Sequence, residues 1–416
     1  MRKLLIICLF GAFNLSLFSQ TPLDGYLEKA ASQNPTLKAK FNMYLAALEK
    51  VEQKGSLPDP TVSFGYFISP VETRVGAQRF KAGLSQMFPW RGTLPKQKQL
   101  AASLAQVKFE EFEAAKNMLF LEIKNSYLSL YELEKQLEIN ATNLELLKSF
   151  EPISKTKYES NLASLADLVR VQIKIDEAST QLELLKLKRE PLLSDFNTLL
   201  NNEIPISIDQ IDLTFELNTE KEVDFTLDSA VQNNPSIRAV QEQISSTNYQ
   251  VELAELASKP KIGLGLEYGF IQKRDMPNIP DNGKDILAPT ISLSLPIFRK
   301  KNEALKQEAG FMQEAYKNQI EAVQNQITNQ WVMANFQFEK ANTELRLYDK
   351  ELEKTELLLK LLTTDYSNNN TQFDQLLSTL QLILQLKLSA LTASVNLQES
   401  LFNFNFLTGT TLTQFR

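Results

Sequence analysis

The side chains that most often carry enzyme chemistry are scarce in this 416-residue sequence. It has no histidine, a single cysteine (Cys8), and 13 glycines with no glycine-rich phosphate loop among them. Histidine is the commonest general base and the commonest neutral metal ligand. We therefore expect no enzyme, no catalytic or metal-binding residue and no cofactor. The many Asp and Glu side chains are expected to be solvated positions that flank long helices.

The charge balance and the N-terminal residues narrow the possible functional classes of the protein further. The chain has 44 Lys and Arg against 50 Asp and Glu, so it has no basic surplus for binding nucleic acid. Residues 1–20 begin with Arg2 and Lys3, continue as an apolar run that contains Cys8, and predict a secretory signal peptide. No later stretch approaches 18 consecutive apolar residues, so no membrane-spanning helix is expected.

The sequence contains an internal repeat, so the helices and strands that would position any functional residue are expected to occur twice. LEKAASQNP at residues 27–35 matches LDSAVQNNP at 227–235, and the match continues through Pro60 with Pro260 and Pro89 with Pro296. We expect a first repeat over 21–204, a linker over 205–222 and a second repeat over 223–416. Each repeat has the order helix, two strands, long helix pair.

Four segments alternate apolar and polar residues with a period of two, which predicts strands at about 61–69, 80–89, 260–271 and 287–297. A soluble sandwich gives the same alternation, but export without a spanning helix favours a transmembrane barrel. Four strands cannot close a barrel, whereas three chains would supply twelve strands and an open lumen. The residues expected to face lipid are Ile262, Leu264, Leu266, Ile291, Leu293 and Leu295.

The remaining long segments carry apolar residues every seven positions, for example Leu130, Leu137 and Leu144. Sustained heptads predict supercoiled helix pairs. The helix expected over about 95–150 would extend roughly 80 Å. The fold class is therefore mostly α with a small β part: a coiled-coil helical barrel joined to a β-barrel that closes as an oligomer.

The duplicated order, LSLPIF at 293–298 and its counterpart SQMFPWRG at 85–92 resemble the TolC-like outer membrane efflux proteins. The resemblance covers essentially the whole chain after the signal peptide. It implies a homotrimer in the lipid of the outer membrane that extends into the periplasm. The implied partners are a periplasmic adaptor and an inner-membrane pump of the resistance-nodulation-division type. The implied function is a passive exit duct.

QMFPWRGTL at 86–94 is most similar to the branch of that family that serves cation and heavy-metal efflux. Nothing in the chain itself would select a metal. Two other functions stay open: an exit duct for type I protein secretion, and a periplasmic helical scaffold whose strands are soluble. The exported substrate, whether metal ion, drug or polypeptide, is also open.

The resemblance also assigns roles to the turns between the long helices. It implies a periplasmic gate formed by Asp374, Asp167, Tyr366 and Tyr158. It implies adaptor contacts at six residues: Asn161, Leu162, Ser164, Asn369, Asn370 and Thr371. Asp374 repeated by three-fold symmetry would form a carboxylate ring that favours cations. The alternative is that Asp374 only caps the last helix. Asn161 and Asn369 stand where the family usually has glycine, and asparagine tolerates the left-handed conformation.

Overall fold

The computed structural model describes residues 22–202, 204–211, 213, 226–276, 280–367 and 373–409. The predicted signal peptide, most of the predicted linker and the tip residues Asn369, Asn370 and Thr371 lie outside the described residues. The chain divides into two compact units. The first unit contains Met1–Asn34, Glu122–Glu220 and Ala341–Glu399, and the second contains Pro35–Leu121, Lys221–Lys340 and Ser400–Arg416.

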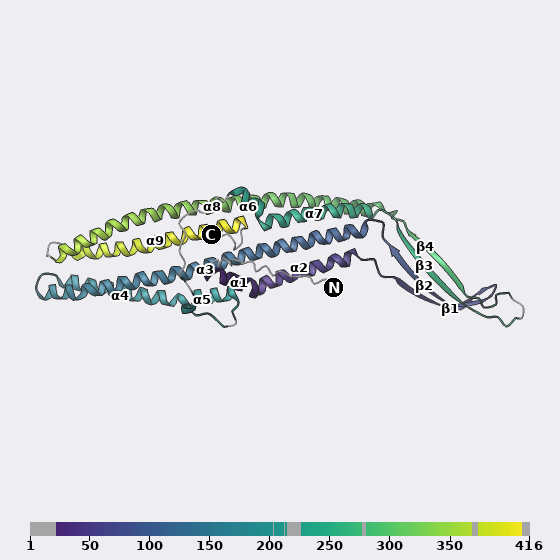
Figure 1. The fold of residues 1–416 in the computed structure, drawn as a ribbon, viewed down its shortest axis with the longest axis horizontal. Helices are drawn as coiled ribbons and strands as arrows, with labels where there is room; N and C mark the ends of the chain where they lie inside the picture. Colours follow the sequence, from purple (N-terminus) through teal and green to yellow (C-terminus); the bar gives the residue numbers. More distant parts are fainter. Residues whose placement is uncertain are drawn as a thin grey trace, which may run out of the picture. The chain divides into compact units, whose positions relative to one another are not determined.

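The elements follow the expected order (Figure 1). They are α1 (Pro22–Gln33), α2 (Pro35–Gly55), β1 (Thr61–Thr73), β2 (Gly76–Phe88), α3 (Thr93–Glu159), α4 (Leu165–Leu187), α5 (Arg189–Leu200), a 3-10 turn (Ile208–Gln210), α6 (Leu227–Asn233), α7 (Pro235–Leu256), β3 (Lys261–Gln272), β4 (Ile286–Ser294), α8 (Arg299–Ser367) and α9 (Phe373–Thr408). The predicted fold class, mostly helical with one small β part, is confirmed.

The two halves differ in their last long helix. α9 is continuous, whereas its counterpart is split at Lys188 into α4 and α5. Pro191 is the third residue of α5. A proline lacks the amide hydrogen and its ring clashes with the carbonyl four residues earlier, here that of Leu187. The split therefore lies where the sequence forbids a regular helix.

Each repeat begins with a helix that is broken before a proline, at Asn34-Pro35 and at Asn234-Pro235. Both asparagine amides hold the end of the last helix of their own repeat. Asn34 Nδ2 donates to Leu199 O at 3.2 Å in the first unit, and Asn234 Nδ2 donates to Leu407 O at 3.3 Å in the second. Asn234 Oδ1 also caps α7 by accepting from Ser236 N at 2.9 Å.

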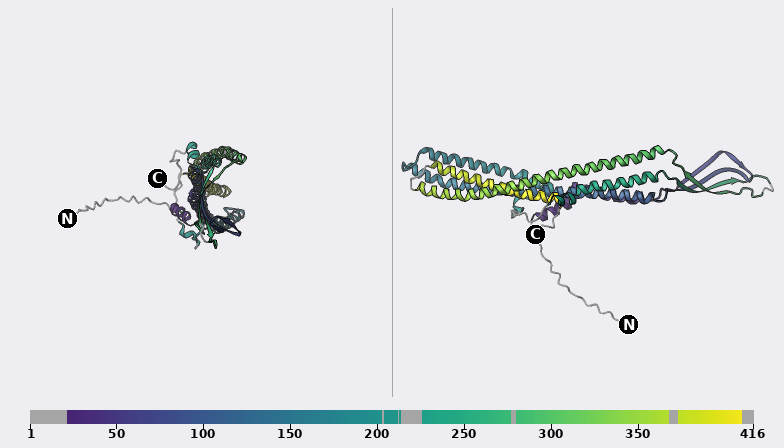
Figure 2. Two further views of the ribbon diagram at one scale, coloured as in Figure 1. Left: turned by 90° about the vertical axis from the view of Figure 1, so that its right-hand side faces the viewer. Right: turned by 90° about the horizontal axis from the view of Figure 1, so that it is seen from above.

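The predicted heptad positions form the core of the first unit, where α4 runs beside the second part of α3 and α9 beside α8 (Figures 1 and 2). Leu144, Leu147, Val171 and Ala178 are buried with residues of α9. A second cluster joins Leu133, Leu137 and Leu185. These contacts place the apolar seam of α3 against α4 and α9, as seven-residue spacing predicts.

Each repeat buries aromatic side chains near the end of its last helix: Phe196 in the first, and Phe402 and Phe404 in the second. In the first unit, Phe196 packs edge-on against Tyr26 of α1 with ring centroids 5.2 Å apart. In the second unit, Phe404 packs against Trp331 at 4.8 Å and Phe338 at 6.3 Å. Such pairs bury large apolar areas in preferred geometries, so each repeat has its own anchor.

Among the described residues, α9 is long and apolar enough to cross a membrane by length and composition. The sequence reasoning had expected no such helix, because α9 contains no uninterrupted apolar run. Leu376, Leu377 and Leu380 of α9 are buried in the helical core of the first unit. Packing against α3 and α4 therefore explains part of this apolar composition.

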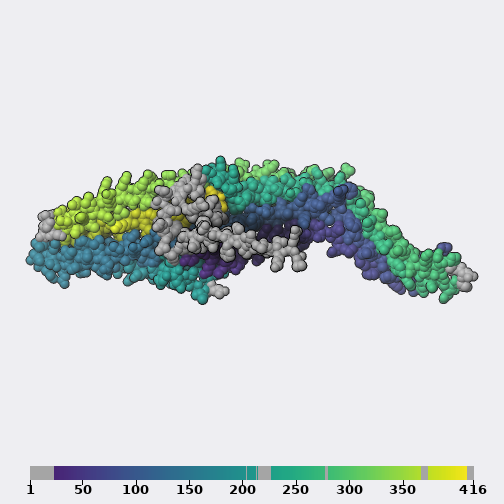
Figure 3. Space-filling model, viewed as in Figure 1, coloured from purple at the N-terminus to yellow at the C-terminus, as the bar shows by residue number. Residues whose placement is uncertain are grey.

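The strands form one antiparallel sheet in the order β1-β2-β3-β4, within the second unit. β1 pairs Val62 with Leu84, β2 pairs Leu84 with Leu266, and β3 pairs Ile262 with Leu293. β1 and β4 are therefore the two edges, and each has one side without a strand partner in the described chain. The sheet is a single layer, and no helix covers its visible face in the space-filling view (Figure 3).

β4 ends earlier than the sequence suggested. It stops at Ser294, so Leu295 lies just outside the strand instead of inside a segment running to residue 297. Pro296 has no amide hydrogen for a strand ladder, and Ile297 N donates to Leu295 O at 3.0 Å in a tight turn. β1 and β2 together extend farther than expected at the opposite end of the sheet, to the turn between Thr73 and Gly76.

The buried anchor of the second unit gives a stability prediction. Phe404→Ala should lower the free energy of unfolding by about 3–5 kcal/mol, because a buried aromatic ring is lost and a cavity is left. Phe404→Leu retains most of the volume and should cost less than about 1.5 kcal/mol. Urea unfolding of the detergent-solubilised protein, followed by circular dichroism, measures both. Equal midpoints for the two variants would contradict the anchor role.

Candidate functional site

One face of the sheet carries apolar side chains on all four strands, with Gln86, opposite Leu264, as a polar exception. The register brings Val62, Leu84, Leu266 and their neighbours onto the same face as Ile291 and Leu293. These side chains are exposed: Ile262 by 41%, Leu264 by 49%, Leu266 by 46%, Ile291 by 79% and Leu293 by 56%. Exposed apolar area on this scale marks a surface that meets lipid or another protein. Leu295, just past β4, is 64% exposed.

The opposite face carries mostly small or polar side chains, with Met87, opposite Gly263, as an apolar exception. Its residues include Ser63, Ser85, Thr290 and Ser292, with glycines directly across the strand pairs. A β-carbon at Gly263 would meet the Ser292 hydroxyl, and one at Gly265 would meet Thr290. The glycines therefore let hydroxyl groups lie flat on this face. One ion pair, Lys81 Nζ to Glu267 at 2.7 Å, joins β2 to β3 there.

The turn between α3 and α4 is closed at both ends by its own backbone and side chains. Asn161 has a φ of 55°, Leu162 N donates to Lys157 O at 2.8 Å, and Asn161 N donates to Tyr158 O at 3.0 Å. This is a Schellman motif with asparagine in the left-handed position. Ser164 then begins α4, and its side chain and that of Asp167 cap one another's backbone amides.

Arg170 brings the two predicted gate aspartates together. Its Nη1 lies 3.4 Å from Asp167 Oδ1 on α4 and 3.7 Å from Asp374 Oδ1 at the start of α9. The Asp374 side chain is 70% exposed and the Asp167 side chain 20%. Asp167 is the third residue of α4 and Asp374 the second of α9, so their positions in the two helices differ by one. An exposed ion pair adds little stability. Arg170 nevertheless places one positive charge within 4 Å of both carboxylates.

The two predicted gate tyrosines occupy different environments. Tyr158 is 41% exposed, whereas Tyr366 is 5% exposed and packs against Phe373 with ring centroids 5.1 Å apart. Lys157 Nζ lies 3.8 Å from the centroid of the Tyr366 ring and donates to Tyr366 O. A cation at this carbonyl suits the negative end of the α8 dipole.

The Tyr366 hydroxyl is held in a dry environment. Burial raises the pKa of Tyr366, and the negative charge of Asp167 acts in the same direction. The Ser154 hydroxyl is near enough to stabilise the phenolate and opposes that rise. Both hydroxyls are buried, and neither makes a hydrogen bond within the described part of the chain. Tyr366 therefore stays neutral across the physiological range.

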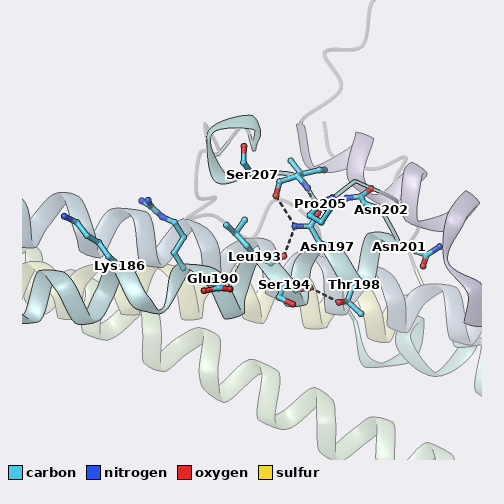
Figure 4. Close-up of a pocket in the computed structure, with 12 residues that line it drawn as sticks. Lys186, Glu190, Leu193, Ser194, Asn197, Thr198, Asn201, Asn202, Pro205 and Ser207 are labelled. Carbon is cyan, nitrogen blue, oxygen red and sulfur yellow. Dashed lines mark hydrogen bonds between the residues drawn. The ribbon is translucent and has the colours of Figure 1, made fainter.

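A third feature, an open groove of about 750 Å³, lies along α5 (Figure 4). Asn197 holds the segment after α5 over this groove: its Nδ2 donates to Ile206 O at 3.0 Å, and its Oδ1 accepts from Ile206 N at 2.7 Å. Arg189, also on the groove, is paired with both carboxylate oxygens of Glu134 at 2.8 and 2.7 Å. The Asn197 side chain in this groove thus anchors the segment that follows the first repeat.

The structure brings together some of the sequence-predicted residues and leaves others apart. Asp167, Asp374 and Tyr366 lie at the ends of α4, α9 and α8 in the first unit, and Asn161, Leu162 and Ser164 form the turn beside them. Asn369, Asn370 and Thr371 lie outside the described residues. Sequence reasoning missed Arg170 and Lys157. Their positive charge near a carboxylate-rich turn was a signal, but only the folded chain shows which groups they meet.

The sequence of the second repeat matches a known family. Residues 226–403 fit the family of outer membrane efflux proteins. Nodulation protein T of Rhizobium leguminosarum bv. trifolii is 20% identical over an alignment of 262 residues, and the match covers 59% of this chain and 55% of that protein. The match therefore spans little more than half the length of this curated relative.

Solved outer membrane channels share the fold over nearly the whole chain. OprN superposes with a TM-score of 0.74 at 17% identity, covering 94% of this chain and 90% of OprN. CusC gives 0.75 at 14% identity, with 95% and 96% coverage. CmeC of Campylobacter jejuni gives 0.73 at 16%, with 93% and 85% coverage. The chain has the TolC-like fold, and these scores do not separate one channel from another.

The capped turn gives a local prediction. Ser164→Ala removes the N-cap of α4 and should cost about 1 kcal/mol, which is roughly a fivefold faster opening of the first turn. Hydrogen–deuterium exchange of a peptide covering residues 160–170 would detect it. Ser160→Ala, an exposed serine four residues earlier, is the matched control and should leave exchange unchanged. Equal exchange in both variants would show that the cap does not stabilise this turn.

Proposed function

We propose that this chain, with its TolC-like fold and an efflux-protein sequence in its second half, is an exit channel of the bacterial outer membrane. Three copies form a passive duct that extends into the periplasm and completes a tripartite efflux system. The observation that carries this proposal is the sheet: it has one continuous, exposed apolar face and two strand edges without a partner in the described chain.

In lipid, a sheet with two unpaired edges must close into a barrel. The bilayer core offers no hydrogen-bond partners, so an unpaired strand edge is too costly there. The apolar face of Ile262, Leu264, Leu266, Ile291, Leu293 and Leu295 meets lipid in this proposal. The serine, threonine and glycine face lines the duct. Three copies provide twelve strands, and a barrel of that size leaves an open lumen.

The helix turns of the first unit meet a periplasmic adaptor, which joins the channel to an inner-membrane pump of the resistance-nodulation-division type. Support comes from the shape and exposure of the first turn. Leu162 is 59% exposed on a turn that its Schellman motif and capping box hold in one conformation. Asn161, Ser164 and the second turn, with Asn369, Asn370 and Thr371, complete the proposed contact surface.

The proposed gate lies at the same helix ends. Asp374 of each copy contributes to a ring of carboxylates, and Asp167, which completes the capping box of α4, is linked to Asp374 through Arg170. Arg170 supplies one positive charge to both aspartates, so it reduces the cation preference that the ring would otherwise have. Tyr158, which is half exposed, contributes to the neighbouring surface, whereas Tyr366 is buried against Phe373 and packs the end of α8.

We assign the chain to the cation and heavy-metal branch on the strength of QMFPWRGTL at residues 86–94 alone. The full sequence has no histidine, and its one cysteine lies in the predicted signal peptide. Soft metal ions prefer those ligands. Selection of the substrate therefore belongs to the adaptor and pump, and the duct passes what they deliver.

The barrel assignment is tested by placing a charge on either face. Leu264→Lys on the apolar face should cost about 2–4 kcal/mol at mid-bilayer depth and deplete the heat-sensitive oligomer seen in unheated gels of detergent-extracted membranes. Met87→Lys on the opposite face should assemble like wild type. Recovery of the wild-type protein in the soluble periplasmic fraction would overturn the channel proposal and favour a scaffold.

The gate assignment is tested by the charge at the helix ends. A unit charge at about 4 Å in water is worth about 1 kcal/mol, roughly a fivefold change in an equilibrium. Asp374→Asn should therefore lower the cation-to-anion permeability ratio by up to about fivefold, and Arg170→Gln should raise it. Reversal potentials in planar bilayers under a salt gradient measure both. Identical potentials for wild type and both variants would rule out a charge ring at Asp374.

A further inference from the structure

An open groove lies where the second hairpin of the sheet meets the helices. It has a volume of about 630 Å³ and is lined by the end of α7, the start of α8 and the turn that follows β4, all within the second unit (Figure 1). Building on the proposed channel, we propose that this groove binds a phospholipid with a net negative headgroup from the periplasmic leaflet of the outer membrane. An acyl chain lies against Leu295 and Ile297, and the phosphate meets Arg299.

One wall of the groove continues the lipid-facing side of the sheet. β4 ends at Ser294, and the next three residues, Leu295, Pro296 and Ile297, line the groove. Leu295 and Ile297 are 64% and 71% exposed, and the adjacent Phe298 is 82% exposed. Exposed apolar side chains in an unbroken row mark a surface that meets lipid or protein. An acyl chain that lies along β4 can therefore continue into the groove without leaving apolar surface.

Three consecutive cations follow the apolar wall at the start of α8. Arg299 lines the groove, Lys300 and Lys301 come next, and all three are exposed. None of the three forms an ion pair with a residue that the structure describes, and the first turn of α8 contains no acidic residue. Cations just outside the apolar core of a membrane are attracted by anionic headgroups. The order of apolar wall and then cations matches that of acyl chain and then phosphate.

The other charged groups of the groove leave this positive charge in excess. Lys306 Nζ lies 2.7 Å from Glu255 Oε1, and this hydrogen bond, together with the positive charge of Lys306, lowers the pKa of Glu255 below its ordinary value. Those two groups therefore neutralise one another. Glu303 also lines the groove and forms no ion pair within the described chain. It lies one turn after Arg299, and a cation that precedes a carboxylate at this spacing is the weaker of the two orders.

The first repeat lacks the basic run. When Pro89 is aligned with Pro296, the three cations stand where the first repeat has Gly92, Thr93 and Leu94. The cation of the first repeat nearest to these positions, Arg91, corresponds to Phe298. Both repeats nevertheless turn from strand to helix at this point. The three cations are therefore not needed for that turn, and a ligand of the second repeat accounts for them.

The position of the groove favours lipid over a neighbouring copy. α7 leads into the β3–β4 hairpin and α8 leads out of it, so both walls of the groove belong to one repeat of one chain. The groove lies at the end of the sheet from which the helices extend into the periplasm. In the proposed channel, this end is at the periplasmic surface of the membrane, where phospholipid headgroups lie.

Quenching of tryptophan fluorescence by brominated phospholipids tests the site. Ile297→Trp, in a chain whose two tryptophans are changed by Trp90→Phe and Trp331→Phe, places a probe in the groove. In reconstituted bilayers, brominated phosphatidylglycerol should bind at the probe about fivefold or more tightly than brominated phosphatidylcholine. The factor follows because one cation near an anionic surface contributes about 1 kcal/mol, which is about fivefold.

Charge variants show which groups recognise the headgroup. Changing Arg299, Lys300 and Lys301 together to Gln should make binding of the two lipids equal. Glu303→Gln should increase the preference for phosphatidylglycerol, because it removes the carboxylate that opposes the phosphate. The matched control changes three exposed cations farther along α8 and should leave the preference unchanged: Lys350→Gln, Lys354→Gln and Lys360→Gln.

The outcomes separate the lipid site from the channel. Unheated gels show whether each variant has assembled, and native mass spectrometry of lipid bound to the wild type, to the Arg299, Lys300 and Lys301 variant and to the matched control replaces quenching for a probe chain that has not. An assembled channel with equal affinity for both lipids, or an equal loss in the matched control, would overturn the site and leave the channel standing. Wild-type protein in the soluble periplasmic fraction would overturn the channel itself.

Two further arms test what the groove recognises. Equal binding of brominated phosphatidylethanolamine and phosphatidylglycerol would overturn selection by net charge, because the two share a phosphate. Inorganic phosphate should displace phosphatidylglycerol no better than sodium chloride of the same ionic strength. Selective displacement by inorganic phosphate would show a site for a soluble anion and would overturn the lipid assignment.

Discussion

The fold depends on backbone hydrogen bonds that one chain cannot complete by itself. The sheet exposes an apolar face on all four strands, yet β1 and β4 each present a strand edge with no partner in the described chain. In water such edges invite uncontrolled pairing, and in lipid they are prohibitive. Closure with further copies satisfies the edges, and insertion of the closed barrel into lipid covers the apolar face. The proposed channel follows from that requirement.

Duplication explains how one sequence builds the required parts. Both repeats use an asparagine before a proline to hold the end of their last helix, and both bury a phenylalanine there, Phe196 and Phe404. The repeats have diverged where function is proposed. Tyr158 is half exposed, whereas Tyr366 is buried. Asp167 takes part in the capping box of α4, and Arg170 pairs with both Asp167 and Asp374. Shared positions maintain the scaffold, and the differing ones change the charge and packing at the helix turns.

Much of the scaffold could be predicted from sequence because it depends on local periodicity. The alternation in β3, the heptads through Leu137 and Leu144, and the breaks at Pro35 and Pro235 all act within a few residues. The pairing of Arg170 with Asp374 could not be predicted, because those residues are far apart in sequence and meet only after α4 and α9 pack. The early end of β4 had a visible cause in Pro296. Tyr366 is buried, whereas its repeat mate Tyr158 is half exposed, and this burial depends on contacts with Phe373 and Lys157 that no spacing encodes.

The number of chains in the detergent-solubilised particle tests the central claim most directly. Native mass spectrometry of the purified protein, released from its detergent micelle in the gas phase, gives that number without reference to any relative. The account predicts three copies of the mature chain, because four strands from each copy give the twelve strands of an open barrel. A particle that contains a single copy, stable without detergent, would contradict it.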